Sequence, residues 1–105
     1  MRDQALGEGE PEPTESGIRR VFEIVNKKGL HARASAKFVQ TVEKFDAQVT
    51  VTRGSETVGG NSIMGLMMLS AATGTEITVD VSGKQAEDAM AAIADLVTSG
   101  FGEED

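Results

Sequence analysis

The sequence has no cysteine, tryptophan or tyrosine, and its 105 residues include a single histidine. The lack of cysteine excludes disulfide bonds and thiolate chemistry, and it fits a reducing compartment. No apolar run approaches the roughly 20 residues that cross a bilayer, and the first residues lack the apolar centre of a secretion signal. We therefore expect a cytoplasmic protein without membrane insertion, built around one small hydrophobic core.

Proline is also scarce, and both prolines lie near the beginning of the chain, where acidic residues are concentrated. Residues 1–16 carry five acids and one arginine, and Leu6 is their one large aliphatic side chain, so we predict a disordered acidic tail. We expect residues 17–102 to form one domain, in which nine acidic residues balance nine basic ones. Residues 103–105 form an acidic C-terminal end that we expect to be solvated. The near-neutral domain argues against a nucleic-acid-binding protein, although the whole chain has a net charge of −7.

Hydrophobic spacing within the domain switches between a period typical of strands and one typical of helices. Alternating or β-branched segments predict four strands, at residues 18–25, 48–52, 56–58 and 76–82. Apolar residues three and four positions apart predict three helices, at residues 32–45, 63–70 and 86–97. The order β-α-β-β-α-β-α, with strands that bury one face only, predicts an α+β fold. In this fold a four-stranded, mainly antiparallel sheet carries three helices on one face.

Local signals predict where the helices begin and end. Ser62 lies at the N-cap position of the second helix, and Gly74 is expected to stop that helix. Ser82 and Gln85 have the S-x-x-Q spacing of a capping box before the third helix. Gly100 can close the third helix.

Few segments of the domain carry candidate chemistry. The carboxylates show no metal-ligand spacing, and the glycine pair at residues 59–60 lacks the lysine of a nucleotide-binding loop. We therefore predict no metal and no cofactor. The remaining candidates are the segment that contains His31 and the short apolar helix after Ser62.

The charge around His31 favours an anion-binding role. Lys27, Lys28 and Arg33 lie at the start of the first helix, where the positive end of the helix dipole normally favours acidic residues. Cations at this place are explained if a phosphate binds between the free helix N–H groups and the arginine. The same positive end favours the neutral, nucleophilic imidazole. The alternative is that the histidine is a capping or surface residue.

The short helix after Ser62 has more apolar side chains than one buried face can hold. Some of them are therefore expected at the surface, where methionine adapts to several partners. Ser62 is also a candidate for phosphorylation, because a helix N-terminus tolerates negative charge. Packing in the core is the alternative role for this helix. The residues predicted to bind partners are Ile63, Met64, Leu66, Met67 and Met68.

Two motifs, GLHAR at residues 29–33 and SIMGLM at residues 62–67, resemble those of the HPr family of phosphocarriers. These carriers belong to the phosphoenolpyruvate-dependent phosphotransferase system. The resemblance extends over about residues 18–100. It implies the open-faced β-sandwich of that family, which has the predicted order of elements.

The resemblance also implies roles for three residues. His31 would accept a phosphoryl group on Nδ1 from enzyme I and pass it to an enzyme IIA domain, and Arg33 would contact that group. Ser62 would be the target of a regulatory HPr kinase/phosphorylase, and the apolar residues after it would help to dock partners. The protein would then be a monomeric, stoichiometric phosphoryl relay rather than a turnover enzyme alone.

The sequence departs from the family pattern at two places. The family usually has proline after the arginine, whereas this chain has Ala34, which restores a backbone N–H in the first helical turn. Lys28 stands where many sugar-transport members carry a small polar residue. With these departures the chain resembles the nitrogen-related NPr branch, or the HPr-like proteins of proteobacteria that lack a full sugar system. Sugar transport and nitrogen or metabolic regulation therefore both stay open. A non-catalytic adaptor of the same fold, controlled by phosphorylation at Ser62, is the alternative function.

Overall fold

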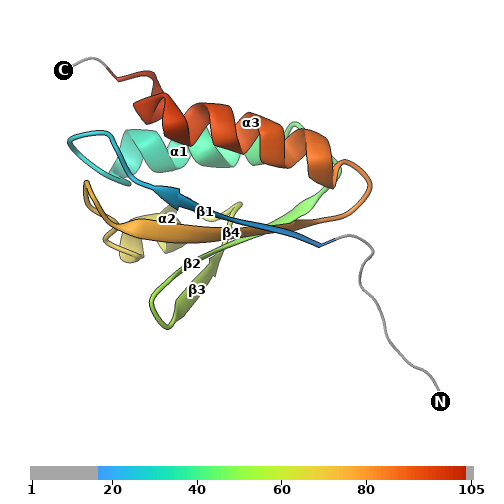
Figure 1. Cartoon of the computed structure of the whole chain (residues 1–105), viewed down its shortest axis with the longest axis horizontal. Helices are drawn as coiled ribbons and strands as arrows, with labels where there is room; N and C mark the ends of the chain where they lie inside the picture. The colour runs from blue at the N-terminus through green and yellow to red at the C-terminus, as the bar shows by residue number, and fades with distance from the viewer. Residues whose placement is uncertain (1–16, 104–105) are drawn as a thin grey trace.

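The structure is a computed structural model, and it describes residues 17–103. The predicted disordered tail, residues 1–16, and the last two acidic residues lie outside the described part. No helix within residues 17–103 is long and apolar enough to span a membrane. The elements follow the predicted order: β1 (Ile18–Glu23), α1 (Ala32–Val42), β2 (Gln48–Arg53), β3 (Glu56–Gly59), α2 (Ile63–Met68), β4 (Glu76–Ser82), α3 (Ala86–Thr98) and a 3-10 turn, η2 (Gly100–Gly102) (Figure 1).

The four strands form one open sheet in the order β1-β4-β2-β3, and every neighbouring pair is antiparallel. Val81 of β4 lies opposite Ile18 of β1 and Val49 of β2, so the apolar positions of the strands are in register on one face. Helices α1 and α3 lie side by side over that face (Figure 1), and α2 packs against α1 and β3. The predicted α+β open-faced sandwich is confirmed.

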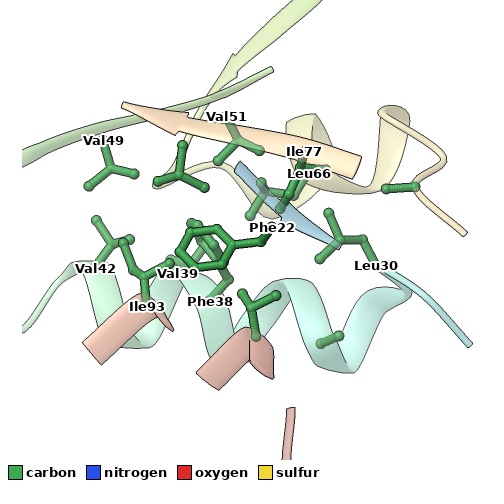
Figure 2. Packing of buried hydrophobic residues seen from close by; sticks show 14 of the residues in the cluster. Phe22, Leu30, Phe38, Val39, Val42, Val49, Val51, Leu66, Ile77 and Ile93 are labelled. Atoms are coloured by element: carbon green, nitrogen blue, oxygen red, sulfur yellow. The ribbon is translucent and has the colours of Figure 1, made fainter. Parts of the chain in front are cut away.

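The core lies between the sheet and the helices. Phe38 of α1 and Ile93 of α3 are fully buried against Val51 and Ile77 of the sheet, and Leu66 of α2 joins the same cluster (Figure 2). Burying a side chain of this size stabilises the fold by about 1.5–3 kcal/mol. This shared core fixes the starts of α1 and α2, the two segments that carry the candidate residues.

Helices α1 and α2 end at other positions than the sequence predicts, whereas α3 ends at Thr98, just before the predicted stop at Gly100. Helix α1 ends at Val42 rather than near Phe45, because the N–H of Phe45 turns back to the Val42 carbonyl at 3.2 Å and tightens the chain into a turn. Helix α2 ends at Met68, where Ser70, with φ 53°, reverses the chain. Gly74 lies beyond this reversal, so its predicted role as the helix stop is wrong.

The predicted capping box before α3 is also wrong. Ser82 remains in β4 opposite Gln48, and the N-cap residue of α3 is Gln85, which makes no side-chain cap bond. The Gln85 Oε1 atom instead accepts a hydrogen bond from the Asp46 N–H at 2.8 Å. Pairing in the sheet therefore prevails over local capping, because Ser82 is paired with Gln48 in β4 and lies three residues before the N-cap residue of α3.

A close backbone contact sets the position of the loop before α1. Gly29 has a φ of +65°, and a Cβ atom at this residue would lie 2.3 Å from the Ala71 carbonyl oxygen. The neighbouring Leu30 N–H donates to the same oxygen at 3.0 Å. Only glycine allows this approach, which ties the loop before α1 to the segment after α2.

We predict that Gly29→Ala destabilises the protein far more than Gly54→Ala does. Gly54 has a similar φ of +62°, but none of the described residues has an atom within 4 Å of an added Cβ. Gly54→Ala should therefore cost about 1 kcal/mol from the backbone conformation alone. Gly29→Ala should cost at least about 2 kcal/mol, because the Ala71 carbonyl has to move. Urea unfolding of both variants measures this, and equal costs would contradict the close contact.

Candidate functional site

His31 is the N-cap residue of α1. Its extended backbone (φ −75°, ψ −177°) places the ring over the first turn, where Nδ1 accepts a hydrogen bond from the Arg33 N–H at 3.2 Å. The His31 carbonyl accepts the first helical bond, from Ser35 N–H at 2.8 Å. Because Nδ1 is an acceptor, the ring proton lies on Nε2. The ring therefore presents the lone pair of Nδ1 beside the positive end of the helix dipole.

The carboxylate of Glu103 lies against the other ring nitrogen. Its Oε2 atom forms a hydrogen bond with Nε2 of His31, and the two side chains are only 14% and 27% exposed. The sequence predicts a solvated acidic end at Glu103, and the structure corrects that prediction. Sequence separation explains the failure, since the pair spans 72 positions and no local pattern connects them.

Residues Gly100–Glu103, here called the C-terminal strap, bring Glu103 to the site. Gly100, Phe101 and Gly102 have φ values of 68°, 60° and 70°, so the chain turns sharply after α3. Phe101 is 1% exposed, and its burial offsets the cost of about 1–2 kcal/mol for a left-handed non-glycine residue. Lys37 Nζ donates to the Phe101 carbonyl at 2.7 Å and fixes the strap to α1.

The site is a depression of about 630 Å³ with basic side chains around His31. Lys28, Arg33 and Lys37 line it together with Glu103, and the first turn of α1 contains no acidic residue. The sequence predicts a place at the site for Lys28 and Arg33, but not for Lys37. Its position four residues after Arg33, on the same side of the helix, is a signal that could have identified it. This charge distribution suits a small anion such as a phosphoryl group.

Residues 17–103 contain no group of three or more histidine and acidic side chains placed to hold a metal ion. The depression around His31 has one carboxylate among several cations, which is the reverse of what a cation site needs.

Ser62 is the N-cap residue of α2, as predicted, and its Oγ accepts a hydrogen bond from the Gly65 N–H at 2.9 Å. Four of the five residues predicted to bind partners are exposed, with Met64 and Met68 at 71% and 70%. Leu66 is fully buried, because it occupies the side of the helix that faces the core, so it cannot contact a partner directly. We call the exposed set the α2 patch: Ile63, Met64, Met67 and Met68.

The end of α2 connects this patch to the histidine. Ser70 and Ala71 line a shallow depression together with His31 and Lys28. Arg53 of β2 donates to the Leu69 carbonyl at 3.2 Å and holds the end of the helix. The segment that follows the α2 patch therefore borders the same depression as the imidazole.

The hydrogen bond from Nε2 of His31 lowers the pKa of Glu103 below its ordinary value of 4.5. A hydrogen bond from Asn26 Nδ2 to Oε1, at 3.2 Å, and the charge of Lys28 act in the same direction, whereas partial burial acts against them. The carboxylate is therefore ionised at neutral pH.

Comparisons with known proteins agree with this geometry. The family described as "PTS HPr component phosphorylation site" matches residues 18–99. The chain is 50% identical over 86 residues to phosphocarrier protein HPr of Neisseria meningitidis serogroup B, an alignment that covers 82% of this chain and 97% of that protein. It is 39% identical to phosphocarrier protein NPr of Escherichia coli K12, over 83% and 98% of the two chains. The crystal structure of HPr from Thermoanaerobacter tengcongensis superposes with a TM-score of 0.80 at 42% identity, covering 84% and 99%.

We predict that Glu103→Gln destabilises the protein in a pH-dependent way. Because folding lowers the pKa of Glu103, its carboxylate stabilises the folded state above pH 4.5 and loses this effect as the pH falls through the folded-state pKa. The free energy of unfolding of the variant should lie below that of the parent by a constant amount near neutral pH, and the two should converge in acid. Denaturant titrations at several pH values measure the difference.

Glu56→Gln, at an exposed position on β3, is the control and should show no such convergence. A Glu103→Gln difference that stays the same from neutral to acidic pH would contradict the assigned hydrogen bond between the ionised carboxylate and His31.

Proposed function

The chain belongs to the HPr family of phosphocarriers, and on this basis we propose that it accepts a phosphoryl group on Nδ1 of His31. The donor is the phosphorylated histidine of an enzyme I, and the acceptor is an enzyme IIA domain of the phosphotransferase system. The observation that carries the proposal is the placement of His31 at the start of α1, with Nδ1 accepting a hydrogen bond and cations on both sides. The pathway served is sugar transport or nitrogen and metabolic regulation in the cytoplasm.

Transfer exchanges one N–P bond for another. The Nδ1 lone pair of His31 forms the new bond in line as the N–P bond of the donor breaks, and the electron pair of that bond returns to the ring nitrogen of the donor. The proton on Nε2 stays in place, so positive charge develops on the ring of His31. The second transfer repeats these steps in reverse, with Nδ1 as the leaving group. The partly exposed ring suits a relay that two partners reach in turn.

Arg33 contributes two groups to the transfer. Its N–H, which donates to Nδ1 in the free protein, passes to an oxygen of the phosphoryl group once Nδ1 is bonded to phosphorus. Its guanidinium is exposed beside the ring and pairs with the remaining phosphoryl oxygens. The helix end and the arginine together offset the negative charge of the transferring group without a metal or other cofactor.

Both partners dock on the α2 patch. Adaptable methionine side chains fit two different surfaces, and the neighbouring depression leads to His31. The same patch supports the second candidate, a regulatory adaptor that is controlled at Ser62. A phosphate on that N-cap oxygen would displace the bond from Gly65 N–H and add charge at the edge of the patch. An HPr kinase/phosphorylase is the partner implied for that modification. For both candidate functions we expect the protein to act as a monomer. We expect no nucleic acid among its partners.

We predict that phosphoenolpyruvate and a cognate enzyme I place an acid-labile, base-stable phosphate on this protein. His31→Ala should abolish the label, because the chain has no other histidine. Ser62→Ala is the matched control and should keep it. The adaptor function instead predicts an acid-stable phosphate, formed with ATP and a kinase and lost in Ser62→Ala. A label that persists in His31→Ala, or never forms on the parent, would overturn the relay.

We predict that Arg33→Ala slows phosphoryl uptake by roughly 10- to 100-fold, the effect of losing one charge-assisted hydrogen bond in the transition state. Arg33→Lys should recover part of the rate, since it keeps the charge but loses the planar fork. Rapid-quench measurement of phosphorylated protein gives the rates, and circular dichroism checks the fold. Loss of helical signal in Arg33→Ala would assign the residue a structural role instead.

A further inference from the structure

A buried amide lies behind the site and has a role that the relay alone does not require. Asn26, in the loop between β1 and α1, is only 6% exposed. Its Nδ2 atom donates to the Gly29 carbonyl at 2.8 Å and to Oε1 of Glu103 at 3.2 Å. Its Oδ1 atom accepts no hydrogen bond from any of residues 17–103. Leaving a buried acceptor unpaired lowers the free energy of unfolding by about 1–3 kcal/mol. The amide keeps this orientation because Nδ2 makes two hydrogen bonds in it.

The surroundings of Asn26 allow no other orientation of its amide. Both partners of Nδ2 are acceptors, one a backbone carbonyl and the other a carboxylate. A flipped amide would place Oδ1 against these two oxygens, lose both hydrogen bonds and add electrostatic repulsion. The amide therefore always directs an N–H toward Glu103.

Glu103 passes this orientation on to the imidazole. One carboxylate oxygen accepts from Asn26 and the other contacts Nε2 of His31. We propose that Asn26 and Glu103 are positioning residues for phosphoryl transfer, with Asn26 orienting the carboxylate and the carboxylate holding Nε2 protonated. The inference rests on the proposed phosphocarrier function, because it concerns the nitrogen that takes the phosphoryl group.

The geometry of the ring makes this arrangement compatible with transfer. The two nitrogens of an imidazole point in divergent directions, so a carboxylate at Nε2 leaves Nδ1 open. When the Nδ1 lone pair bonds to phosphorus, positive charge develops on the ring and the adjacent carboxylate offsets it. Carboxylates that hold a catalytic or metal-binding histidine act in the same way.

The C-terminal strap limits how far Glu103 can move from this position. Phe101 is buried in the core, and its carbonyl is held by Lys37. Two contacts therefore restrain Glu103. The C-terminal strap fixes its backbone, and Asn26 holds its carboxylate by a hydrogen bond. A carboxylate held in this way loses little freedom when the ring becomes charged, which is the advantage of preorganisation.

The first test uses the unphosphorylated protein and follows the Nε2–H proton of His31 by NMR. Because His31 is the only histidine, its ring signals are unambiguous. We expect a proton protected from solvent exchange in the parent, and exchange at least about tenfold faster in Glu103→Gln, with Asn26→Ala between the two. Equal exchange in all three proteins would overturn the proposal.

The second test measures phosphoryl uptake from enzyme I. Glu103→Gln should be slower by roughly 10- to 100-fold, and Asn26→Ala should be slower by a smaller factor. If Asn26 acts through Glu103, the double variant is no slower than Glu103→Gln alone. Full additivity of the two effects would refute the coupling.

Thr73→Val is the matched control for loosening of the loop. The Thr73 hydroxyl donates to the carbonyl oxygens of Asn26 and Lys27, the latter at 2.8 Å, but touches neither side chain of the proposed pair. This variant should lose stability yet keep both the protected proton and an uptake rate within about twofold of the parent. Uptake and proton exchange in Thr73→Val that match Asn26→Ala would assign the effect to the loop and overturn the proposal.

The two tests separate this inference from the function on which it rests. If the parent takes no phosphate on His31, the relay fails, and the exchange measurement still decides whether the pair holds the ring. If the parent is phosphorylated and the Glu103 and Asn26 variants match its rate, the relay stands and the positioning role fails.

Discussion

The Leu30 N–H and the Ala71 carbonyl meet at a distance that only a glycine at position 29 allows, and the functional end of the molecule depends on this contact. The contact sets where α1 begins and therefore where the ring of His31 lies. It also holds the segment after α2 against the same loop. A phosphocarrier needs its reactive nitrogen and its docking surface at a fixed spacing, and a backbone hydrogen bond achieves this without depending on mobile side chains.

The C-terminal strap makes a second long-range contact with the site. The left-handed turn after α3, anchored by buried Phe101, places an acidic residue in a basic depression. The loop before α1 and the strap then share one buried amide, Asn26. The negative charge of Glu103 thus becomes part of a locally positive site. Its carboxylate forms its hydrogen bonds with the imidazole and with Asn26, while cations line the same depression. The net charge of the whole chain conceals this arrangement.

Helix α2 serves the core and the surface at once. Leu66 faces the core, while the methionines around it face solvent, because a helix of six residues has room for only one buried side. Side-chain hydrogen bonds stabilise both ends of this short helix. Ser62 caps its start, and its last carbonyl is held by Arg53 at the end that adjoins His31. Under the proposed relay, this one exposed surface would serve the donor and the acceptor in succession.

The sequence alone determined the order of elements, the buried faces of the strands, the cap at Ser62 and the location of His31, because these follow from residue periodicity and from motifs a few residues long. The overall fold was therefore predicted correctly. Local signals failed where they competed with longer-range contacts: the sheet retained Ser82, and Gln85 bonded to Asp46 instead of capping α3. Leu66 was included among the partner-binding residues because composition does not say which side of a short helix faces the core. Glu103 was assigned to solvent because its partners lie 72 and 77 positions away. Periodicity reports only on neighbours along the chain, so the carboxylate at His31 and the amide behind it were decided by tertiary packing alone.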